Sequence, residues 1–252
     1  MTLQELQDKN NYSTDKGIKN TIYMKIEVYA ICYNEEVRLP YFLRHYSQFA
    51  DIIVYDNQST DRSLNIMRGK AKVISYDTNN KLRDDVFLEI KNNCWKGSKA
   101  DWVIVCDIDE LVYHPLIELI LLKSEATIFQ PKLFNMFSEK LPTTKGQIYE
   151  EIQYGTEDDR PKMLVFRPDQ IKEINFLPGC HEANPTGNIV LSKELITLHY
   201  QFLSRQFTID RYKEFSKRLS VINRENGWSF HYDFKKKEIN NLYDSQNLIK
   251  VI

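Results

Sequence analysis

The chain has 252 residues, of which 42% are hydrophobic and 27% charged, and its formal net charge at pH 7 is -1. A soluble chain of this length and composition can bury a sizeable core without disulfides or a structural metal. The balanced charge gives no bulk attraction to nucleic acid, which argues against polyanion binding by overall charge.

The cysteines and the hydropathy pattern predict a cytoplasmic protein. The four cysteines form no CxxC pair, and Cys32 and Cys106 lie in apolar runs, as buried reduced thiols do. The longest apolar stretch, residues 116–122, contains Glu118 and is far too short to cross a bilayer. The first twenty residues lack the apolar segment of a signal peptide, so we expect neither a leader nor a transmembrane segment.

Residues 1–23 are polar and without clear periodicity, so we expect a loose N-terminal arm. From residue 24, short apolar runs alternate with segments of helical period, which is typical of β-α units that build a mostly parallel sheet flanked by helices. On the helix predicted over 84–98, the side chains of Val86, Ile90 and Cys94 should face this sheet. The strands predicted in this half are 25–33, 51–56, 71–76 and 101–107, and the helices are 37–49, 84–98 and 114–124.

After residue 126 the pattern changes to strand-like runs without long helices between them. These runs are 127–137, 162–168, 174–179 and 194–202. We therefore predict an α/β domain over 24–203, with a first half over 24–115 and an α+β half over 116–203 packed onto the edge of the sheet. The remainder, 204–252, is predicted to form a helical extension. Its helices are expected over 205–226 and 233–249.

The segment VIVCDIDE, residues 103–110, runs from a predicted buried strand into three carboxylates. Successive side chains of a strand alternate faces, so Asp107 and Asp109 should point to one side and Ile108 to the core. Two carboxylates repel each other unless a positive group joins them, and Mn²⁺ or Mg²⁺ prefers oxygen ligands. The pair therefore predicts a metal site, with Glu110 as a supporting or capping residue.

Other polar residues are expected at the same edge, because ligands of open α/β sheets bind at the carboxyl ends of the strands. Asp56 ends the second predicted strand, and Asn34 and Glu35 follow the first. The sequence has neither GxGxxG nor GxxxxGK[ST], so no glycine-rich loop is available to neutralise a phosphate with backbone amides. If this crevice holds a diphosphate, a metal must carry the compensating charge.

Three motifs, YNEE at 33–36, VYDNQSTDRS at 54–63 and DWVIVCDIDE at 101–110, occur in an order that resembles the GT-A-fold glycosyltransferases, especially family two. The resemblance covers residues 25–115. It implies a metal-dependent enzyme that moves a sugar from a nucleotide-sugar donor, with UDP the expected nucleotide, to a hydroxyl of a glycan or lipid-linked acceptor. The first half, 24–115, would then bind the nucleotide sugar and the second half the acceptor.

The resemblance also implies roles for individual residues. Asp56 would contact the nucleoside, Asn34 and Glu35 would line its pocket, and Asp107 and Asp109 would serve the metal and the diphosphate. An arginine that many members carry before the DxD motif has only KLRDD as its counterpart here, and Arg83 is not assigned to that role.

Four basic residues are further candidates. Lys91 could reach a phosphate, although helix lysines are more often solvated, and Lys162 could pair with a phosphate or with one of the acids. His199, in ITLHY, is placed like the late histidine that completes the metal shell in several GT-A enzymes; a satisfied core histidine is the alternative. His181 follows Gly179, which lets the backbone turn closely, and is an alternative metal ligand or an acceptor contact.

Transfer with inversion, which only the resemblance implies, needs a carboxylate that takes the proton from the attacking hydroxyl. Glu182 in GCHE follows a predicted strand of the second half, and Asp158 in GTEDD resembles the TED-like motif of processive family-two enzymes. Glu182 is the favoured base, because the GTEDD loop comes before the strand 162–168 rather than after it.

Two other classes of protein share parts of the pattern. A haloacid-dehalogenase-type phosphatase also uses a DxD after an apolar strand, but it predicts Thr or Val where Leu111 stands and the motif near the first strand. A non-catalytic nucleotide-sugar or glycan-binding module would bind without turnover, against which the intact acidic set argues. For the aromatic tail around Trp228 and Phe230 we expect packing onto the domain; a second subunit, an acceptor chain or a peripheral membrane contact are the alternatives.

Overall fold

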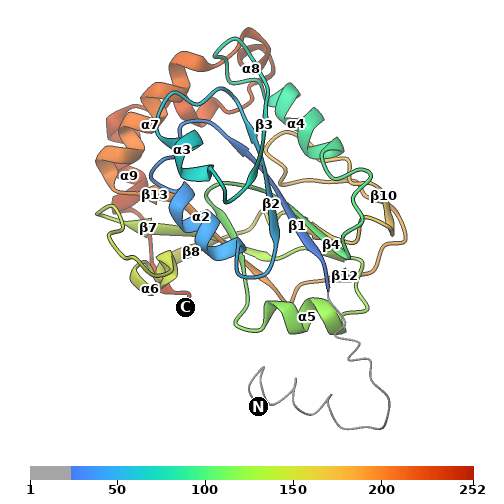
Figure 1. The fold of residues 1–252 in the computed structure, drawn as a ribbon. Helices are drawn as coiled ribbons and strands as arrows, with labels where there is room; N and C mark the ends of the chain where they lie inside the picture. The colour runs from blue at the N-terminus through green and yellow to red at the C-terminus, as the bar shows by residue number, and fades with distance from the viewer. Residues whose placement is uncertain (1–23) are drawn as a thin grey trace, which may run out of the picture.

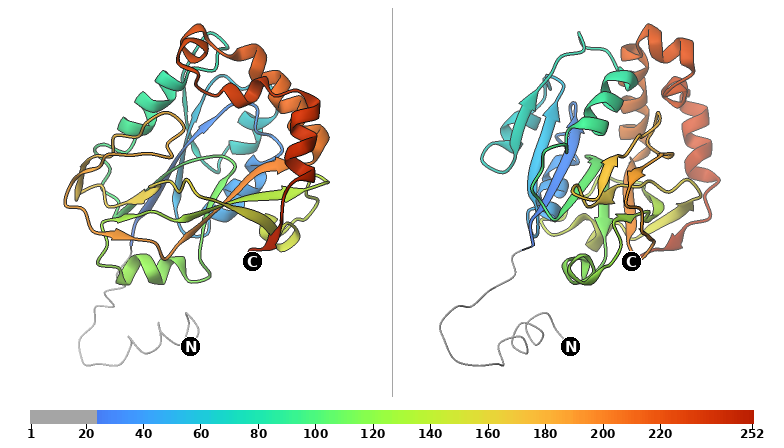
Figure 2. Two further views of the ribbon diagram at one scale, coloured as in Figure 1. Left: turned by 180° about the vertical axis from the view of Figure 1, so that it is seen from behind. Right: turned by 90° about the vertical axis from the view of Figure 1, so that its right-hand side faces the viewer.

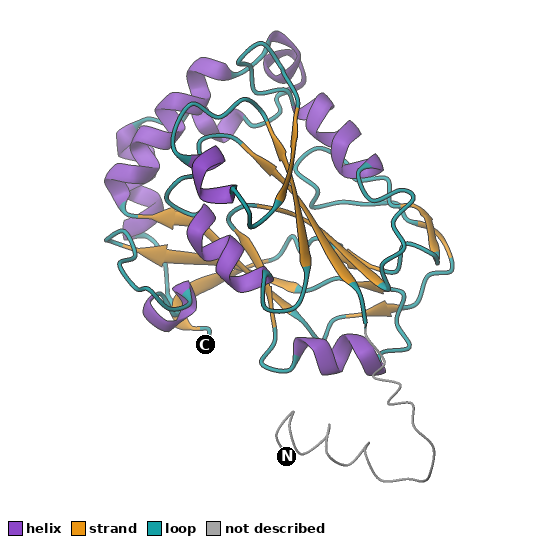
Figure 3. Ribbon diagram, in the orientation of Figure 1, coloured by secondary structure: helices purple, strands orange, loops and turns teal. Residues whose placement is uncertain are grey.

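The computed structural model describes residues 24–252, so the arm expected over 1–23 lies outside the described residues. The described part is a mixed α/β structure with a mostly parallel central sheet flanked by helices, which confirms the predicted fold class (Figure 1). Figure 3 shows the helices around the strands. None of the helices within residues 24–252 is long and apolar enough to cross a membrane. All four cysteines are unpaired thiols, as expected.

The central sheet has seven strands in the order β12-β6-β9-β4-β1-β2-β3. Within this sheet the neighbouring strands β4, β1, β2 and β3 run parallel to one another, whereas β9 is antiparallel to both β4 and β6. The four strands predicted in the first half are confirmed as β1 to β4. The bounds are β1 Ile26–Cys32, β2 Asp51–Asp56, β3 Lys72–Ser75, β4 Trp102–Asp107, β6 Ile128–Phe129, β9 Val165–Phe166 and β12 Leu191–Ser192.

The register of β1 aligns the ends of three strands. Ile31 lies opposite Asp107 of β4, and Cys32 lies opposite Asp56 of β2. Because the three strands are parallel, their carboxyl ends reach the same edge of the sheet. The expected meeting of these strand ends is therefore present.

The two faces of the sheet pack against different helices. Val28 of β1 belongs to the core beneath α2 (Leu39–Tyr46) and α3 (Ser63–Met67), whereas its neighbour Tyr29 belongs to the core beneath α4 (Asp84–Asn93). This is the two-residue alternation of a strand buried on both faces. Burying one such aliphatic side chain contributes about 1.5–3 kcal/mol, so the paired cores hold the sheet edge in place.

A second sheet has the order β14-β8-β7-β13-β5, and a small two-stranded sheet pairs β10 with β11. Strand β5 starts directly after the DxD turn and is antiparallel to β13; the sequence analysis did not predict it. The predicted strand 174–179 is wrong, since within it Phe176 forms an isolated bridge with Ala183 and no strand is present. The bounds are β5 Glu110–Tyr113, β7 Lys132–Ser138, β8 Tyr154–Asp158, β10 Ile171–Glu173, β11 Thr186–Gly187, β13 Ile196–Leu203 and β14 Ile249–Lys250.

The C-terminal helices run along one side of the molecule, beyond the strands of the second sheet (Figures 1 and 2, orange and red). The single helix predicted over 205–226 is wrong, because the backbone of Leu219 is extended and bridges to Leu82. Ser220 then caps the next helix by accepting the N–H of Asn223 at 3.1 Å. The helix predicted over 233–249 is present but shorter, since it spans only Lys236–Asp244. The remaining helices are α5 Ile117–Lys123, α6 Ile148–Glu151, α7 Arg205–Arg218, α8 Val221–Asn226, the 3-10 turn η1 Phe230–Asp233 and α9 Lys236–Asp244.

Candidate functional site

A cavity of about 520 Å³ lies at the carboxyl edge of the central sheet. Its walls come from the loop after β1, from α4, from the turn after β4, from β7, β8 and β13, and from the C-terminal helices. Asn34, Asp56 and Glu182 do not line it. The predicted site residues that do are Glu35, Lys91, Asp107, Asp109, Asp158, Lys162, His181 and His199.

Asp107 lies between two buried lysines. Lys91 Nζ is 2.7 Å from Asp107 Oδ1, and Lys162 Nζ is 3.7 Å from Oδ2. Burial opposes the charge of this carboxyl group, but the two ammonium groups outweigh that effect and lower the pKa of Asp107. Lys91 is 7% exposed, so the expectation of a solvated helix lysine is wrong. Its long-range partner Asp107 compensates the cost of burying the charge.

Glu110 supports this pair from beneath. Its side chain is fully buried, its Oε1 lies 2.6 Å from Lys162 Nζ, and its Oε2 accepts the backbone N–H of Asp107 at 2.9 Å. The carboxylate therefore caps the turn that carries the DxD motif and also fixes Lys162 beside it. This agrees with a supporting and capping place for Glu110.

Asp109 faces the opposite wall of the cavity. Its Oδ1 is 3.6 Å from His199 Nε2, and its Oδ2 is 4.0 Å from Arg38 Nε. Burial raises the pKa of a carboxyl group, yet His199, Arg38 and Lys162 hold the pKa of Asp109 well below its usual range. Asp107 and Asp109 are thus both ionised at neutral pH.

Asn135 fixes the orientation of His199. The carboxylate of Asp158 can only accept, so the amide nitrogen of Asn135 donates to Asp158 Oδ2 at 3.0 Å. The amide oxygen must then accept from His199 Nδ1–H at 2.9 Å. A neutral His199 consequently presents the lone pair of Nε2 towards Asp109 Oδ1, which is also an acceptor. Two facing acceptors need a proton or a cation between them.

The donor set therefore suits a hard divalent cation in its chemistry: two ionised carboxylates and one imidazole nitrogen. It is not preassembled, because within residues 24–252 no three or more His, Cys, Asp or Glu side chains form a group that could hold a metal ion. The ammonium group of Lys91 lies 2.7 Å from Oδ1, one of the two Asp107 oxygens that such an ion could use.

The loop after β1 is fixed by protein contacts. Arg211 of α7 forms an ion pair with Glu35 and donates to the backbone oxygens of Tyr33 and Asn34. The side chain of Asn34 bonds to Thr60 on the loop after β2. Glu35 thus borders the cavity, while Asn34 faces the neighbouring loop.

Asp56 is 1% exposed and lies below the cavity surface. Its Oδ2 accepts the N–H of Ser59 at 3.0 Å, whereas its Oδ1 is buried without a hydrogen-bond partner among the described residues. Contact of Asp56 with a nucleoside stays a prediction, and it requires the loop after β2 to open.

The two candidate bases lie in different surroundings. Asp158 of β8 lines the cavity, where Arg160 and Asn135 hold its pKa at about 2 even though burial raises it. Glu182 is exposed and outside the cavity wall, and His181 next to it lines the cavity with its Nδ1 2.7 Å from the backbone oxygen of Arg160. Burial and Lys162 lower the pKa of His181 to about 4.

Several residues that hold the site were not among those predicted from the sequence. Arg38 is buried, contacts Asp109 and Glu35, and donates to the backbone of Tyr200 at 3.0 Å. The spacing of Glu35 and Arg38 at i and i+3 was a usable signal. No local signal indicated Asn135, because its partners lie on β8 and β13.

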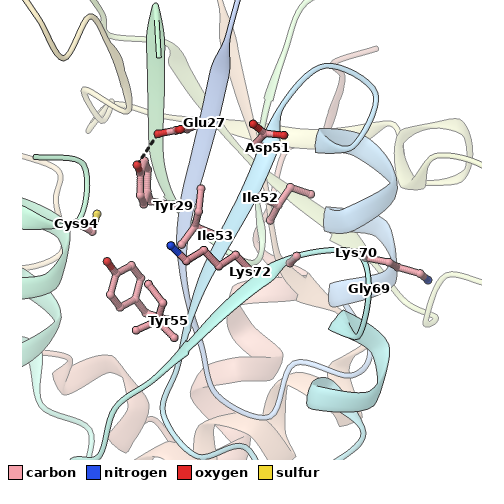
Figure 4. Close-up of a pocket in the computed structure, with 12 residues that line it drawn as sticks. Glu27, Tyr29, Asp51, Ile52, Ile53, Tyr55, Gly69, Lys70, Lys72 and Cys94 are labelled. Atoms are coloured by element: carbon pink, nitrogen blue, oxygen red, sulfur yellow. Dashed lines mark hydrogen bonds between the residues drawn. The ribbon is translucent and has the colours of Figure 1, made fainter. Parts of the chain in front are cut away.

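A second hollow, of about 540 Å³, lies on the face of β1, β2 and β3 that Figure 4 shows. Glu27 there accepts the hydroxyl groups of Tyr29 and Ser98, each at 2.6 Å. The hydroxyl of Tyr29 points towards Glu27, whereas Tyr55 points towards Cys94, whose thiol has its pKa raised to about 12 by burial (Figure 4). The Glu27 carboxylate is thus hydrogen-bonded and the Cys94 thiol protonated, and the other charged residues of the lining are Asp51, Lys70 and Lys72.

No protein-family model matches the chain, and no curated protein matches it. Among solved structures, it is similar to a mannosyltransferase from Pyrobaculum calidifontis in complex with GDP-mannose and Mn²⁺, at 14% identity and a TM-score of 0.30. The match covers 50% of this chain and 41% of that one.

Two further solved structures are similar at the same level. The glycosyltransferase GlyE of Streptococcus pneumoniae has 15% identity and a TM-score of 0.27, over 43% of this chain and 30% of that chain. A putative glucose-1-phosphate thymidylyltransferase of Bacillus anthracis, in complex with a sucrose, has 10% identity and a TM-score of 0.30, over 89% and 84%. This chain thus spans less than half of the length of each of the two glycosyltransferases.

Proposed function

We propose that the protein is a glycosyltransferase that moves a sugar from a nucleotide-sugar donor, UDP-linked by resemblance, to a hydroxyl of a glycan or lipid-linked acceptor. The observation that carries the proposal is the meeting of Asp107, Asp109, Lys91 and Lys162 in one cavity at the carboxyl edge of the sheet. Ionised carboxylates beside buried ammonium groups suit a metal and a diphosphate.

In this proposal Asp107, Asp109 and His199 hold Mn²⁺ or Mg²⁺. When bound, the ion supplies charge that offsets the negative charge growing on the leaving diphosphate. Lys162 stays fixed by Glu110 and directs its remaining N–H groups at the phosphate oxygens. Arg38 keeps Asp109 in place.

We assign the base to Asp158 rather than to the initially favoured Glu182. Asp158 lines the cavity, is ionised, and would take the proton of the acceptor hydroxyl as the new glycosidic bond forms. As held by Arg160 it is a weak base; turning Arg160 towards the solvent on acceptor binding would raise its pKa. Asn135 bonds to both Asp158 and His199, and so fixes the position of the base relative to the metal ligand.

The donor test is a panel of nucleotide sugars, measured for Mn²⁺-dependent thermal stabilisation and for slow donor hydrolysis, with Asp109→Asn beside the wild type. We expect one donor to stabilise the wild type and not the variant. If no nucleotide sugar stabilises the wild type, or if Asp109→Asn responds equally, the proposal is refuted. Phosphate release from p-nitrophenyl phosphate without donor hydrolysis would indicate a phosphatase, and stabilisation without any turnover a binding module.

The base is tested once a donor and an acceptor are known. Asp158→Asn should abolish transfer and leave donor binding intact, because the amide cannot accept the proton. Glu182→Gln is the matched comparison. Loss of transfer in Glu182→Gln with retention in Asp158→Asn would reverse the assignment.

A further inference from the structure

We infer that Lys91 competes with the divalent metal for Asp107, so that the metal and the donor diphosphate bind this centre together and neither binds well alone. This rests on the proposed function, which supplies the metal and the diphosphate. What it adds is a role for Lys91 as an internal counter-ion that must move before the centre can be loaded.

An ammonium group and a divalent ion on the carboxylate of Asp107 would lie close enough to repel each other. Lys91 Nζ is 2.7 Å from Asp107 Oδ1, and a bound Mg²⁺ or Mn²⁺ would need about 2 Å from the same carboxylate. The other oxygen, Oδ2, already faces Lys162 Nζ at 3.7 Å. An ion that approaches Asp107 therefore meets two ammonium groups.

The two lysines differ in their freedom to leave Asp107. Lys162 is anchored at 2.6 Å by Glu110, a fully buried carboxylate that would lose its counter-ion if Lys162 moved. Among the described residues, Asp107 is the one carboxylate within 4 Å of Lys91 Nζ. Lys91 is therefore the lysine that can turn away, provided another anion accepts it.

The charge balance of the centre favours binding of the ion and the diphosphate together. Lys91 and Lys162 balance Asp107 and Glu110, and three of these four side chains are buried. A divalent ion alone would add two uncompensated positive charges, and a diphosphate alone would add negative charges, each at a high cost where water is scarce. Bound together, the ion and the diphosphate compensate each other, and the ammonium of Lys91 can move from Asp107 to a phosphate oxygen.

The coupling is reciprocal, because the diphosphate must raise metal affinity by the same factor by which the metal raises diphosphate affinity. Removing the ammonium of Lys91 should weaken this coupling, and it should do so by raising the affinity for the metal alone. Binding of the metal alone should become stronger, whereas a residue that only helps to build the site would weaken metal binding when it is replaced.

The deciding experiment measures Mn²⁺ binding to the full chain without nucleotide, by the electron paramagnetic resonance signal of free Mn²⁺. Lys91→Met should bind Mn²⁺ at least about ten-fold more tightly than the wild type. Even at the dielectric constant of water, the repulsion between a unit charge and a divalent ion about 5 Å away corresponds to about a ten-fold change in affinity. The matched control is Lys96→Met, which removes the same charge just after α4 from an exposed pair with Glu173. Its Mn²⁺ affinity should equal that of the wild type.

Unchanged or weaker Mn²⁺ binding in Lys91→Met overturns the inference, as does an equal gain in Lys96→Met. Thermal melting checks that the variant is folded, and Lys91→Gln repeats the comparison with a polar side chain. Adding Asp109→Asn to Lys91→Met should remove the gained affinity. A gain that survives this change places the ion elsewhere and also overturns the inference.

A second measurement repeats the titration with UDP-glucose and with GDP-mannose as probes. The nucleotide sugar that binds should raise Mn²⁺ affinity in the wild type, and by a smaller factor in Lys91→Met. An equal factor in both proteins contradicts the inference. If neither these nor the other donors of the panel bind, the proposed function fails, whereas the comparison with metal alone still decides the role of Lys91.

Discussion

Replacing Lys162 with methionine should lower the free energy of unfolding by about 3–5 kcal/mol, because it leaves a buried carboxylate without its counter-ion. Lys162 is 5% exposed and Glu110 is fully buried, with 2.6 Å between Nζ and Oε1. Methionine matches the length of the lysine stem, so the cavity term is small and the electrostatic term dominates.

The size of the electrostatic term is measured by a double-variant cycle in urea, followed by circular dichroism and tryptophan fluorescence at pH 7. Glu110→Gln keeps an acceptor for the N–H of Asp107, which Glu110 now bonds at 2.9 Å. The double variant Lys162→Met with Glu110→Gln should lose only about 1–2 kcal/mol, which implies a coupling of at least about 1 kcal/mol in addition to the loss that Glu110→Gln causes alone.

An exposed ion pair provides the control. Lys132 Nζ lies 3.1 Å from Glu157 Oε1 on the neighbouring strands β7 and β8, and both side chains are largely exposed. Lys132→Met should cost no more than about 1 kcal/mol. If Lys162→Met costs as little as this control, or if the double variant loses the sum of the two single losses, the reasoning about Glu110 is refuted.

Three further predictions concern single residues. Arg160→Ala should move the pKa of Asp158 from about 2 towards its ordinary 3.8, since Arg160 and Asn135 hold it down against burial; a carboxyl-carbon NMR titration in which it stays at about 2 would contradict this. Ser220→Ala should cost about 1 kcal/mol in urea unfolding through loss of the α8 cap, and no loss would show that the cap is dispensable. Burial lowers the pKa of His45 to about 4, so the folded state binds fewer protons and unfolding free energy should fall as pH drops from 6.5. His45→Gln should flatten that fall by up to about 1.4 kcal/mol per pH unit, and identical pH profiles would argue against it.

Much of the parallel sheet could be predicted because each of its strands is a short apolar run that is visible in the local sequence. DIIVYD, predicted as a strand over 51–56, is β2 to the residue, and the DxD motif follows β4 as its apolar run indicates. Strand β5 could not be found in this way. Its four residues follow the turn directly, and its strand partner β13 lies some 85 residues later in the chain.

The polar interior depends on partners that no local pattern contains. Lys91 resembles any helix lysine until Asp107, sixteen residues away, comes within 2.7 Å of it. The break between α7 and α8 depends on Leu82, whose N–H bonds to the backbone oxygen of Arg218 at 2.7 Å. The position of Asp158 at the cavity follows from the pairing of β8 with β7, which sequence periodicity does not specify.

The ion pair between Glu35 and Arg211 joins segments 176 residues apart, which has a consequence for how the protein folds. Contacts of such sequence separation carry a large loop-closure entropy and form late. During synthesis the parallel strands emerge first, while Glu35 has no ion pair with Arg211 until α7 has been made. Because residues of α7 and α9 line the cavity, its wall is complete only after the C-terminal helices have left the ribosome.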